Sequence, residues 1–435
     1  MTLFISIAVA LFVGVLATRV TKYFNMPDVT AYLVAGIIIG PCVLGRLGIE
    51  GLGFTSYESI DNISLFSNLA LGFIAFAIGT EFMIPKLKKV GKQAVVVGLC
   101  EALVAVVFVT GALSILHFII PDKVSLPTAI LLGAIASATA PAATLLVVRQ
   151  YKAQGKVTEI LLPVVALDDA IALICFAVAS GIARGMLGGE IDIVSIIINP
   201  LIEIIASLVL GAILGFALAG LERWFHSNKN RMIFIVSGVM VTVALSMLEI
   251  KIGAVTISFS SLLVCMMLGT VFCNACPVAE DMMDRAEKWT SPLYCLFFVL
   301  SGAALRFDIF TDVFVIIVGL VYIIFRVLGK YFGAAIGSKA THCAPEVNKY
   351  LGFTLIPQAG VALGMSLTAY EILGETGALV RSLVLFSVLV YELIGPTVTK
   401  IALTKSGDIK PKDEDELKRR REDKVKASQE KRNQI

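Results

Sequence analysis

Charged side chains are scarce in this chain of 435 residues, where Asp, Glu, Lys and Arg together make up 16% of the sequence. A soluble domain carries about a quarter, because it needs a shell that faces water. Hydrophobic residues make up 57% instead. The composition excludes an ordinary soluble protein and indicates one that exposes much of its surface to lipid.

Motifs for metal centres, nucleotides and hydrolytic chemistry are also missing. The chain has three His and eight scattered Cys, and its one C-x-x-C pair, Cys273 and Cys276, has no second pair or nearby His to complete a metal or redox site. No G-x-x-x-x-G-K-[ST] sequence is present, which disfavours ATP-driven transport, and neither H-E-x-x-H nor G-x-S-x-G occurs. We therefore expect neither an enzyme nor a bound cofactor, and no nucleic-acid partner.

Apolar runs of about 20 residues recur along the chain, each long enough to cross a ~30 Å hydrocarbon layer as a helix. A helix satisfies its own backbone hydrogen bonds in lipid, and the ~10-residue alternating segments of a membrane barrel do not occur. The sequence predicts an all-α polytopic membrane protein with about thirteen transmembrane helices. Their approximate ranges are 2–18, 28–46, 62–82, 93–119, 126–148, 159–181, 196–222, 232–249, 252–273, 290–306, 310–337, 348–371 and 380–402.

Lysine and arginine are distributed unequally between alternating loops. One set of loops carries sixteen of them, from Arg19 to Lys349, and the other set carries six, from Arg46 to Arg381. Because cytoplasmic loops are richer in Lys and Arg, we expect the first set to be cytoplasmic. The N-terminus then lies on the outer side of the cytoplasmic membrane, and the C-terminus with its charged tail, 403–435, lies on the cytoplasmic side.

The first six predicted spans and the last six flank a linking span, 196–222. Because an odd number of crossings separates equivalent spans, the second set enters the membrane from the opposite side, which is the topology of two inverted repeats. The spans 126–148 and 348–371 hold equivalent places in the two sets, since each is the fifth of six.

Both of these equivalent spans are interrupted by a proline, Pro141 in the first and Pro357 in the second. Proline removes a backbone donor and frees a carbonyl one turn earlier. Thr139 and Gln358 can satisfy groups that are left open. An ordinary kink would explain one such proline, but two at equivalent positions predict two broken helices that cross in mid-membrane, where helix ends and bare carbonyls face ions.

Asp168 and Asp169 stand side by side near the centre of the 159–181 span. Carboxylates are expensive inside a membrane, and two adjacent ones also repel each other. We therefore expect them in a chamber that water reaches, or beside a cation. Neighbouring helical residues point about 100° apart, so one carboxylate can face a cavity while the other faces a protein partner.

Arg326 lies near the middle of the 310–337 span, with Lys330 one turn later on the same face. A guanidinium keeps its proton in proteins, so Arg326 needs either an anion or a cluster of carbonyls, and a purely structural role is open to it. Lys330 is a supporting residue of the core, although it can also extend along the helix toward the cytoplasmic interface.

Together these stretches resemble the core of bacterial sodium/proton antiporters with two adjacent aspartates, members of the monovalent cation:proton antiporter superfamily. The resemblance rests on Ala-Ser-Ala-Thr-Ala-Pro-Ala-Ala-Thr at 136–144 and Leu-Pro-Val-Val-Ala-Leu-Asp-Asp-Ala at 162–170. Residues 35–41, 79–81 and 356–364 are also similar, and the similarity covers roughly residues 1–402.

The resemblance implies that Asp169 alternately binds a proton and a monovalent cation, Na⁺, Li⁺ or K⁺. Asp168 would share this cation site and form an ion pair with Arg326, at a position where electrogenic members commonly have Lys. Because Arg keeps its proton, the number of protons exchanged is open. Glu203 is an alternative partner for Arg326, as in electroneutral branches, and Thr139 is a further oxygen ligand for the cation.

The resemblance also implies a homodimer in which a mobile six-helix core carries the ion past a scaffold domain by an elevator-like movement. Residues 1–92 and 232–306 would form the scaffold, and residues 93–182 and 307–402 the core. Residues 183–231 would link them.

We therefore predict a secondary antiporter that exchanges a monovalent cation for protons by alternating access. Two alternatives stay open. A cation channel or uniporter would move the cation without protons, but it needs no titrating group. A symporter for an organic anion would use the N-termini of the broken helices, but few aromatic or amide side chains lie near the breaks to hold an organic body.

Overall fold

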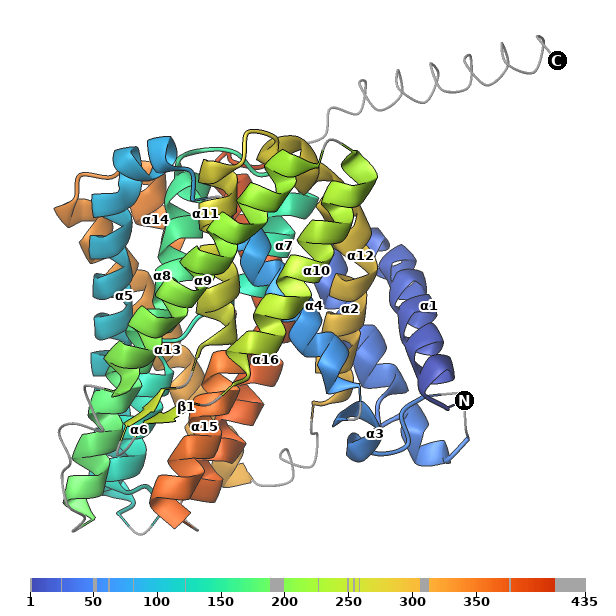
Figure 1. Cartoon of the computed structure of the whole chain (residues 1–435). Helices are drawn as coiled ribbons and strands as arrows, with labels where there is room; N and C mark the ends of the chain where they lie inside the picture. Colours follow the sequence, from blue (N-terminus) through green and yellow to red (C-terminus); the bar gives the residue numbers. More distant parts are fainter. Residues whose placement is uncertain are drawn as a thin grey trace.

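The computed structural model describes residues 2–410, apart from 25, 50–52, 62, 81, 122, 188–198, 226, 249, 253–254, 258, 306–312 and 375–376. Most of the predicted tail, part of the linker and Glu81 of the 79–81 stretch lie outside the described residues. Eight of the described helices are long and apolar enough to cross a membrane by themselves. Figure 1 shows these helices as one bundle, with α1 beginning and α16 ending toward its opposite ends.

Each of the thirteen predicted spans corresponds to a helix or a helix pair. Eleven are single helices: α1 (Thr2–Tyr23), α2 (Asp28–Ile39), α4 (Ser64–Gly79), α5 (Ile84–Ile119), α8 (Lys156–Met186), α9 (Asn199–Trp224), α10 (Asn228–Ser246), α11 (Ser261–Ala275), α12 (Ala279–Ala303), α13 (Val313–Ala340) and α16 (Gly377–Lys405). The other two spans are broken into the pairs α6 (Leu126–Ile135) with α7 (Pro141–Gln150), and α14 (Pro345–Thr354) with α15 (Gly360–Leu373). The prediction of an all-α membrane protein is confirmed.

Besides these helices the described residues form three short elements: η1 (Leu44–Leu47), at the end of the predicted 28–46 span and after the last residue of α2, then α3 (Tyr57–Asp61), and a hairpin of β1 (Ile250–Ile252) with β2 (Val255–Ile257). The hairpin occupies residues that the sequence analysis placed at the start of the 252–273 span, so that boundary was wrong. Its strands are rich in β-branched side chains, which favour extended backbone. Helix α11 begins only at Ser261, where Ser260 caps it by accepting from the Leu263 amide.

Two helices extend further than predicted at the end that carries basic loops. α5 begins at Ile84 instead of 93, and α12 begins at Ala279 instead of 290. The prediction ended spans at charged residues, but Lys, Arg and Glu are good helix formers. Charges therefore mark where a helix leaves the hydrocarbon layer and not where the helix ends.

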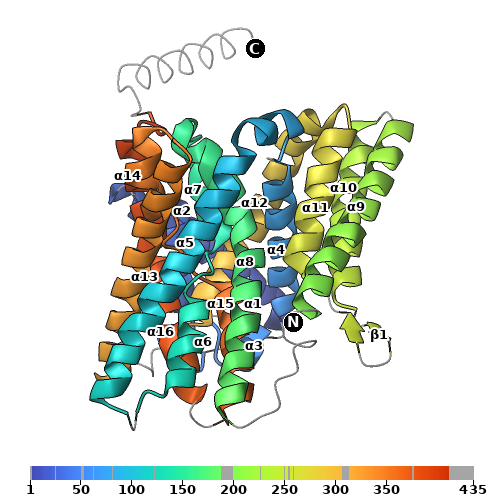
Figure 2. The same cartoon turned by 90° about the vertical axis from the view of Figure 1, so that its left-hand side faces the viewer.

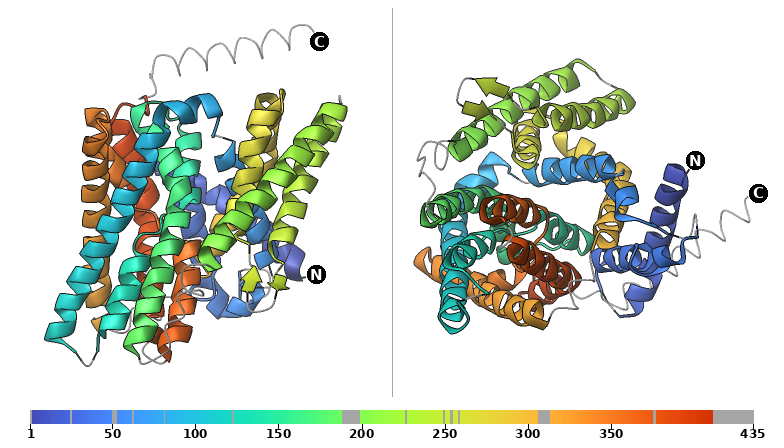
Figure 3. Two further views of the ribbon diagram at one scale, coloured as in Figure 1. Left: turned by 60° about the vertical axis from the view of Figure 1, so that its left-hand side comes forward. Right: turned by 90° about the horizontal axis from the view of Figure 1, so that it is seen from below.

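The helices form two groups that lie on opposite sides of the bundle. Figure 2 shows α5, α13 and α14 on one side and α9, α10 and α11 on the other, and the view from below in Figure 3 separates the same groups. One large hydrophobic cluster joins α4 to α10, α11 and α12, while a second joins α5, α6 and α8 to α13, α15 and α16. This grouping is compatible with the predicted scaffold and core, a division that stays a prediction.

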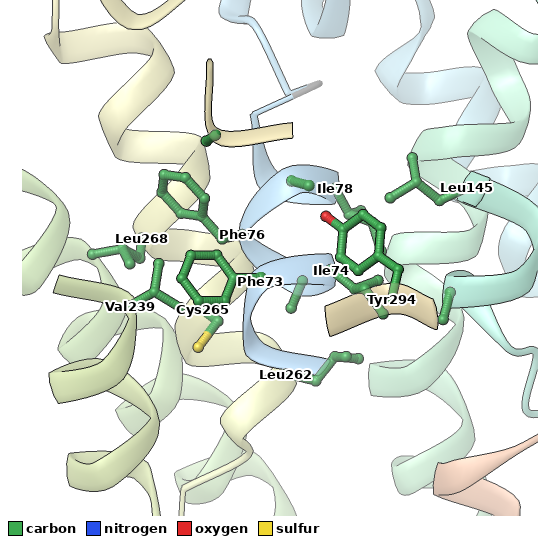
Figure 4. Close-up of a cluster of buried hydrophobic side chains, with 14 of the residues drawn as sticks. Phe73, Ile74, Phe76, Ile78, Leu145, Val239, Leu262, Cys265, Leu268 and Tyr294 are labelled. Atoms are coloured by element: carbon green, nitrogen blue, oxygen red, sulfur yellow. The ribbon is translucent and has the colours of Figure 1, made fainter. Parts of the chain in front are cut away.

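Helix α7 brings the two groups together at α4. Ala142, Ala143 and Leu145 of α7 belong to the cluster around Phe73 and Phe76 of α4. Figure 4 shows Leu145 on the side of this cluster where Ile78 and Tyr294 lie. The second half of one broken helix therefore packs against the other group of helices, while its first half, α6, does not belong to that cluster.

Helices α5 and α13 approach each other backbone to backbone along a row of glycines spaced four residues apart. A Cβ atom added to Gly329 would lie 2.6 Å from Cα of Ala105, and one added to Gly333 would lie 2.5 Å from Cα of Glu101. One added to Gly337 would lie 2.8 Å from Cα of Val97. Small residues at this spacing allow close helix contact in membranes, and here they bring α5 against the face of α13 that carries Lys330.

Candidate functional site

The two broken helices meet at their interruptions. The Ala140 amide, between α6 and α7, donates to the carbonyl of Pro357, between α14 and α15, at 2.8 Å. The side chain of Gln358 donates from Nε2 to the Ile135 carbonyl at 2.8 Å. The predicted crossing of the two breaks is confirmed, and so is the expectation that Gln358 satisfies a group left open by the interruption.

Proline explains where each helix stops or restarts. Pro141 is the first residue of α7, a position where the missing N–H costs nothing because that group has no partner in the helix. Pro357 lies three residues after the last residue of α14, Thr354, and its ring prevents the helix from continuing. Each interruption leaves carbonyls at the end of its first half-helix, where the helix dipole places partial negative charge.

Arg326 neutralises these carbonyls. Its Nε donates to Ala136 O at 2.9 Å and its Nη2 to Ala138 O at 2.6 Å, both in the first break. Its Nη1 donates to Ile356 O in the second break at 2.7 Å. The guanidinium is fully buried, with Cζ 4.5 Å from the ring centre of Tyr391. Arg326 therefore ties the two breaks together through backbone oxygens.

These contacts correct two expectations about Arg326. The ion pair with Asp168 that the resemblance implied is not formed, because all three donor groups of the guanidinium point to carbonyls. The alternative pair with Glu203 is not formed either: Glu203 lies on α9, in the opposite group of helices. Of the two partners that the sequence left open, an anion or a carbonyl cluster, the structure contains the carbonyl cluster.

Lys330 occupies the place that was expected for Arg326. Its Nζ lies 3.2 Å from Oδ2 of Asp168 and donates to Oγ1 of Thr139 at 2.9 Å. It also donates to the carbonyl of Ser137 in the first break. The side chain is fully buried, so of the two positions considered for Lys330 the structure has the one inside the core and not the one at the cytoplasmic interface. A carboxylate and a cluster of oxygens compensate its charge inside the bundle.

Asp168 and Asp169 have different surroundings, as expected from their angular separation on a helix. Asp168 has no exposure and directs Oδ2 at Lys330. Asp169 is 2% exposed, and neither of its carboxylate oxygens has a hydrogen-bond partner among the described residues. A buried carboxylate without a partner is costly unless it binds a proton or a cation, so Asp169 has the surroundings of an exchange site.

The set of ionisable residues is larger than the sequence analysis recognised. Glu101, on α5, lies with Oε2 2.6 Å from Nζ of Lys330, and both side chains are fully buried. Glu392, on α16, is also buried. Both acids lie within apolar runs, so the reasoning that singled out Asp168 would have found them too. Nowhere in the described chain do three or more His, Cys, Asp or Glu side chains form a metal-binding group.

A cavity of about 190 Å³ opens between α2, α7 and α12. Its lining residues are Asp28, Tyr32, Leu146, Arg149, Gln150, Ser291 and Tyr294. It lies beside the first residues of α2, the last residues of α7 and the middle of α12, and the Gln150 side chain accepts from the Asp28 amide at 2.9 Å across it. Asp168 and Asp169 are not among its lining residues, so the chamber expected around the two aspartates is not this cavity.

The sequence as a whole decides the family. A family profile described as "Sodium/hydrogen exchanger, transmembrane" matches residues 7–405. The chain belongs to the sodium/hydrogen exchanger family. The resemblance seen in the motifs is thereby confirmed, and the chain is a multi-pass membrane protein of the monovalent cation:proton antiporter superfamily.

Individual relatives are more distant. The chain is 23% identical over 400 residues to the K(+)/H(+) antiporter subunit KhtU of Bacillus subtilis (strain 168), a match that covers 91% of this chain and 92% of that protein. Among solved structures it is similar to the sodium proton antiporter MjNhaP1 from Methanocaldococcus jannaschii at pH 8, with a TM-score of 0.67 and 18% identity over 93% of this chain and 99% of the other. An electron-microscopy structure of MjNhaP1 matches with a TM-score of 0.68 and 17% identity, over 92% and 94% of the two chains. These structures support the shared fold.

Proposed function

We propose that this family member exchanges K⁺ or Na⁺ for protons at Asp169, with Asp168 as the second carboxylate of the cation site. Cation:proton antiport follows from the family, whereas the ion and the residues are our proposal. The observation that carries it is the buried Asp169 carboxylate, which lacks a hydrogen-bond partner among the described residues and adjoins the Asp168–Lys330 ion pair. K⁺ is included because KhtU is a K(+)/H(+) antiporter subunit.

The exchange proceeds by competition for one site. A cation that binds Asp169 displaces its proton, and a proton that binds displaces the cation, so no separate gate has to link the two ions. Asp168 contributes its charge when it turns from Lys330 to the cation. The hydroxyl of Thr139, 2.9 Å from Lys330 Nζ, supplies an oxygen at the same place.

From the sequence we expected Arg326 to pair with Asp168, but in the structure Arg326 and Lys330 have separate roles. Arg326 keeps its proton and holds the two breaks together. Lys330 is the basic residue whose ammonium group contacts Asp168. Because a lysine holds the position beside Asp168, the permanent proton of an arginine does not limit the number of protons exchanged.

We further propose a homodimer in the cytoplasmic membrane, with the N-terminus outside and the C-terminus inside. The unequal distribution of Lys and Arg between loops supports this orientation. The cavity beside Asp28 and Arg149 then opens to the cytoplasm between α2 and α7.

Exchange is tested in proteoliposomes that hold a pH gradient, to which K⁺, Na⁺ or Li⁺ is added in turn. An antiporter dissipates the gradient only when the transported cation is present, and isotopic flux of that cation must equal a fixed multiple of the proton flux. Cation flux without proton movement would identify a channel or uniporter instead. Dissipation that requires an organic anion would identify a symporter.

A further inference from the structure

Lys330 lies between two carboxylates that come from different helices. Its Nζ is 2.6 Å from Oε2 of Glu101 on α5 and 3.2 Å from Oδ2 of Asp168 on α8. None of the three side chains is exposed. One ammonium group therefore serves two acids, and the shorter contact is with Glu101, which the exchange mechanism described above does not use.

Close contact between the backbones of α5 and α13 fixes the position of Glu101. Gly333, one turn after Gly329 on α13, leaves no room for a side chain against Cα of Glu101. The glycine row thus fixes the backbone of Glu101 beside the turn that carries Lys330. A buried acid at a helix contact is costly and a hydrophobic residue of similar size is often at least as stable, so the fold itself does not require an acid here.

We propose that Glu101 is a positioning residue of the ion site: it holds the ammonium group of Lys330 while Asp168 turns to the transported cation. This inference rests on the proposed exchange at Asp169 and Asp168. With Glu101 in place, Lys330 keeps a carboxylate partner in both states of the cycle. When Asp168 leaves, Lys330 loses one of its two carboxylate contacts and keeps the contact with Glu101.

Glutamine at position 101 removes that second carboxylate. Lys330 then has Asp168 as its one carboxylate partner, so a cation has to compete with a stronger Asp168–Lys330 pair. We expect Glu101→Gln to raise the cation KM for exchange by about tenfold, a size typical of coupling between neighbouring sites. The maximal rate should fall much less, because Asp169 itself is unchanged.

A matched control separates this role from the general effect of neutralising a buried acid. Glu222 on α9 is also a buried glutamate, and it lies 3.8 Å from Nε of Arg231 in the opposite group of helices. Glu222→Gln should leave the cation KM unchanged. Glu101→Asp keeps the acid with a shorter reach and should recover part of the wild-type KM.

The decisive experiment is a double-mutant cycle with Lys330. In a Lys330→Gln background, Glu101→Gln should produce no further rise in the cation KM, because the group it positions is gone. An equal rise in both backgrounds would overturn the proposal, as would a KM for Glu101→Gln no higher than that for Glu222→Gln. If Glu101→Gln does not fold, the same cycle with Glu101→Asp decides.

A second readout keeps this inference separable from the proposed function. Stabilisation of the purified protein by added K⁺ or Na⁺, followed as the rise in Tm with cation concentration, reports cation affinity without transport. Wild-type protein that is stabilised by a cation but exchanges no protons would refute the proposed antiport. Even then, Glu101→Gln should raise the cation concentration needed for a given rise in Tm by about tenfold. An unchanged concentration dependence would refute the positioning role alone.

Discussion

Arg326 and Lys330 lie one turn apart on α13, and they neutralise different parts of the site. Arg326 donates to carbonyls of both broken helices, at Ala136, Ala138 and Ile356. Lys330 contacts the carboxylates of Asp168 and Glu101. One cation of α13 therefore holds the crossing of the breaks in place, and the other is paired with the acids.

Asp169→Asn should abolish exchange while the protein still folds. The amide is nearly the same size as the carboxylate but accepts neither a proton nor a cation in exchange, so the site loses its titrating group. Dissipation of a pH gradient in proteoliposomes on adding K⁺ or Na⁺ should fall to the level of protein-free vesicles, with an unchanged size-exclusion profile. A rate equal to wild type would show that another residue carries the proton.

Lys330→Gln should destabilise the protein by about 3 kcal/mol, because it leaves two buried carboxylates without their cation. Thermal unfolding in detergent measures the loss, with Lys349→Gln on the exposed surface of α14 as the control. Adding Glu101→Gln and Asp168→Asn to Lys330→Gln should recover part of the stability, since no uncompensated charge then remains in this cluster. A triple variant less stable than Lys330→Gln would contradict the assigned ion pairs.

Arg326→Lys should also lower stability, by about 3 kcal/mol, because an ammonium cannot reach three carbonyls in two different segments with the geometry of a guanidinium. It should not make the exchange rate newly sensitive to membrane voltage, because Lys330 already contacts Asp168. Arg149→Lys is the control, since its guanidinium donates to the Ala77 carbonyl at 3.4 Å in a half-buried position. A voltage dependence that appears only in Arg326→Lys would assign Arg326 to the ion cycle.

Asp408→Ala should destabilise α8, the helix that carries the two aspartates. Oδ2 of Asp408 accepts from the Thr158 amide at 2.7 Å and from the Thr158 hydroxyl at 2.8 Å, in the first turn of α8. An acid that accepts from an amide in the first turn stabilises a helix N-terminus by about 1 kcal/mol.

The same contact predicts the effect of a second substitution. A Cβ atom at Gly155 would lie 2.4 Å from Oδ1 of Asp408, so Gly155→Ala should lower Tm in the same direction as Asp408→Ala. Asp281→Ala, which breaks an exposed pair with Arg285, should change Tm far less. Equal Tm values for Asp408→Ala and Asp281→Ala would show that Asp408 does not cap α8.

The ion pair of Asp168 shows where sequence reasoning reached its limit. Residues four apart on a helix share a face, so Arg326 and Lys330 were equivalent candidates from spacing alone. Which of them meets a carboxylate depends on where α6 and α14 stop and on the distance between α5 and α13. Glu101 was overlooked because its partner lies 229 positions away in the sequence, although its presence in an apolar run was a usable signal.

Apolar run length and proline act locally along the chain, so the sequence was enough to predict the membrane class, the thirteen helical spans and the two interruptions. It also identified Asp168 and Asp169, since an acid in lipid is conspicuous wherever it points. Which charged side chains pair with each other follows from the folded helices and not from the sequence. Partners on α5, α8 and α13 meet through helix packing, and that packing depends on contacts between glycines and backbone atoms far apart in the chain.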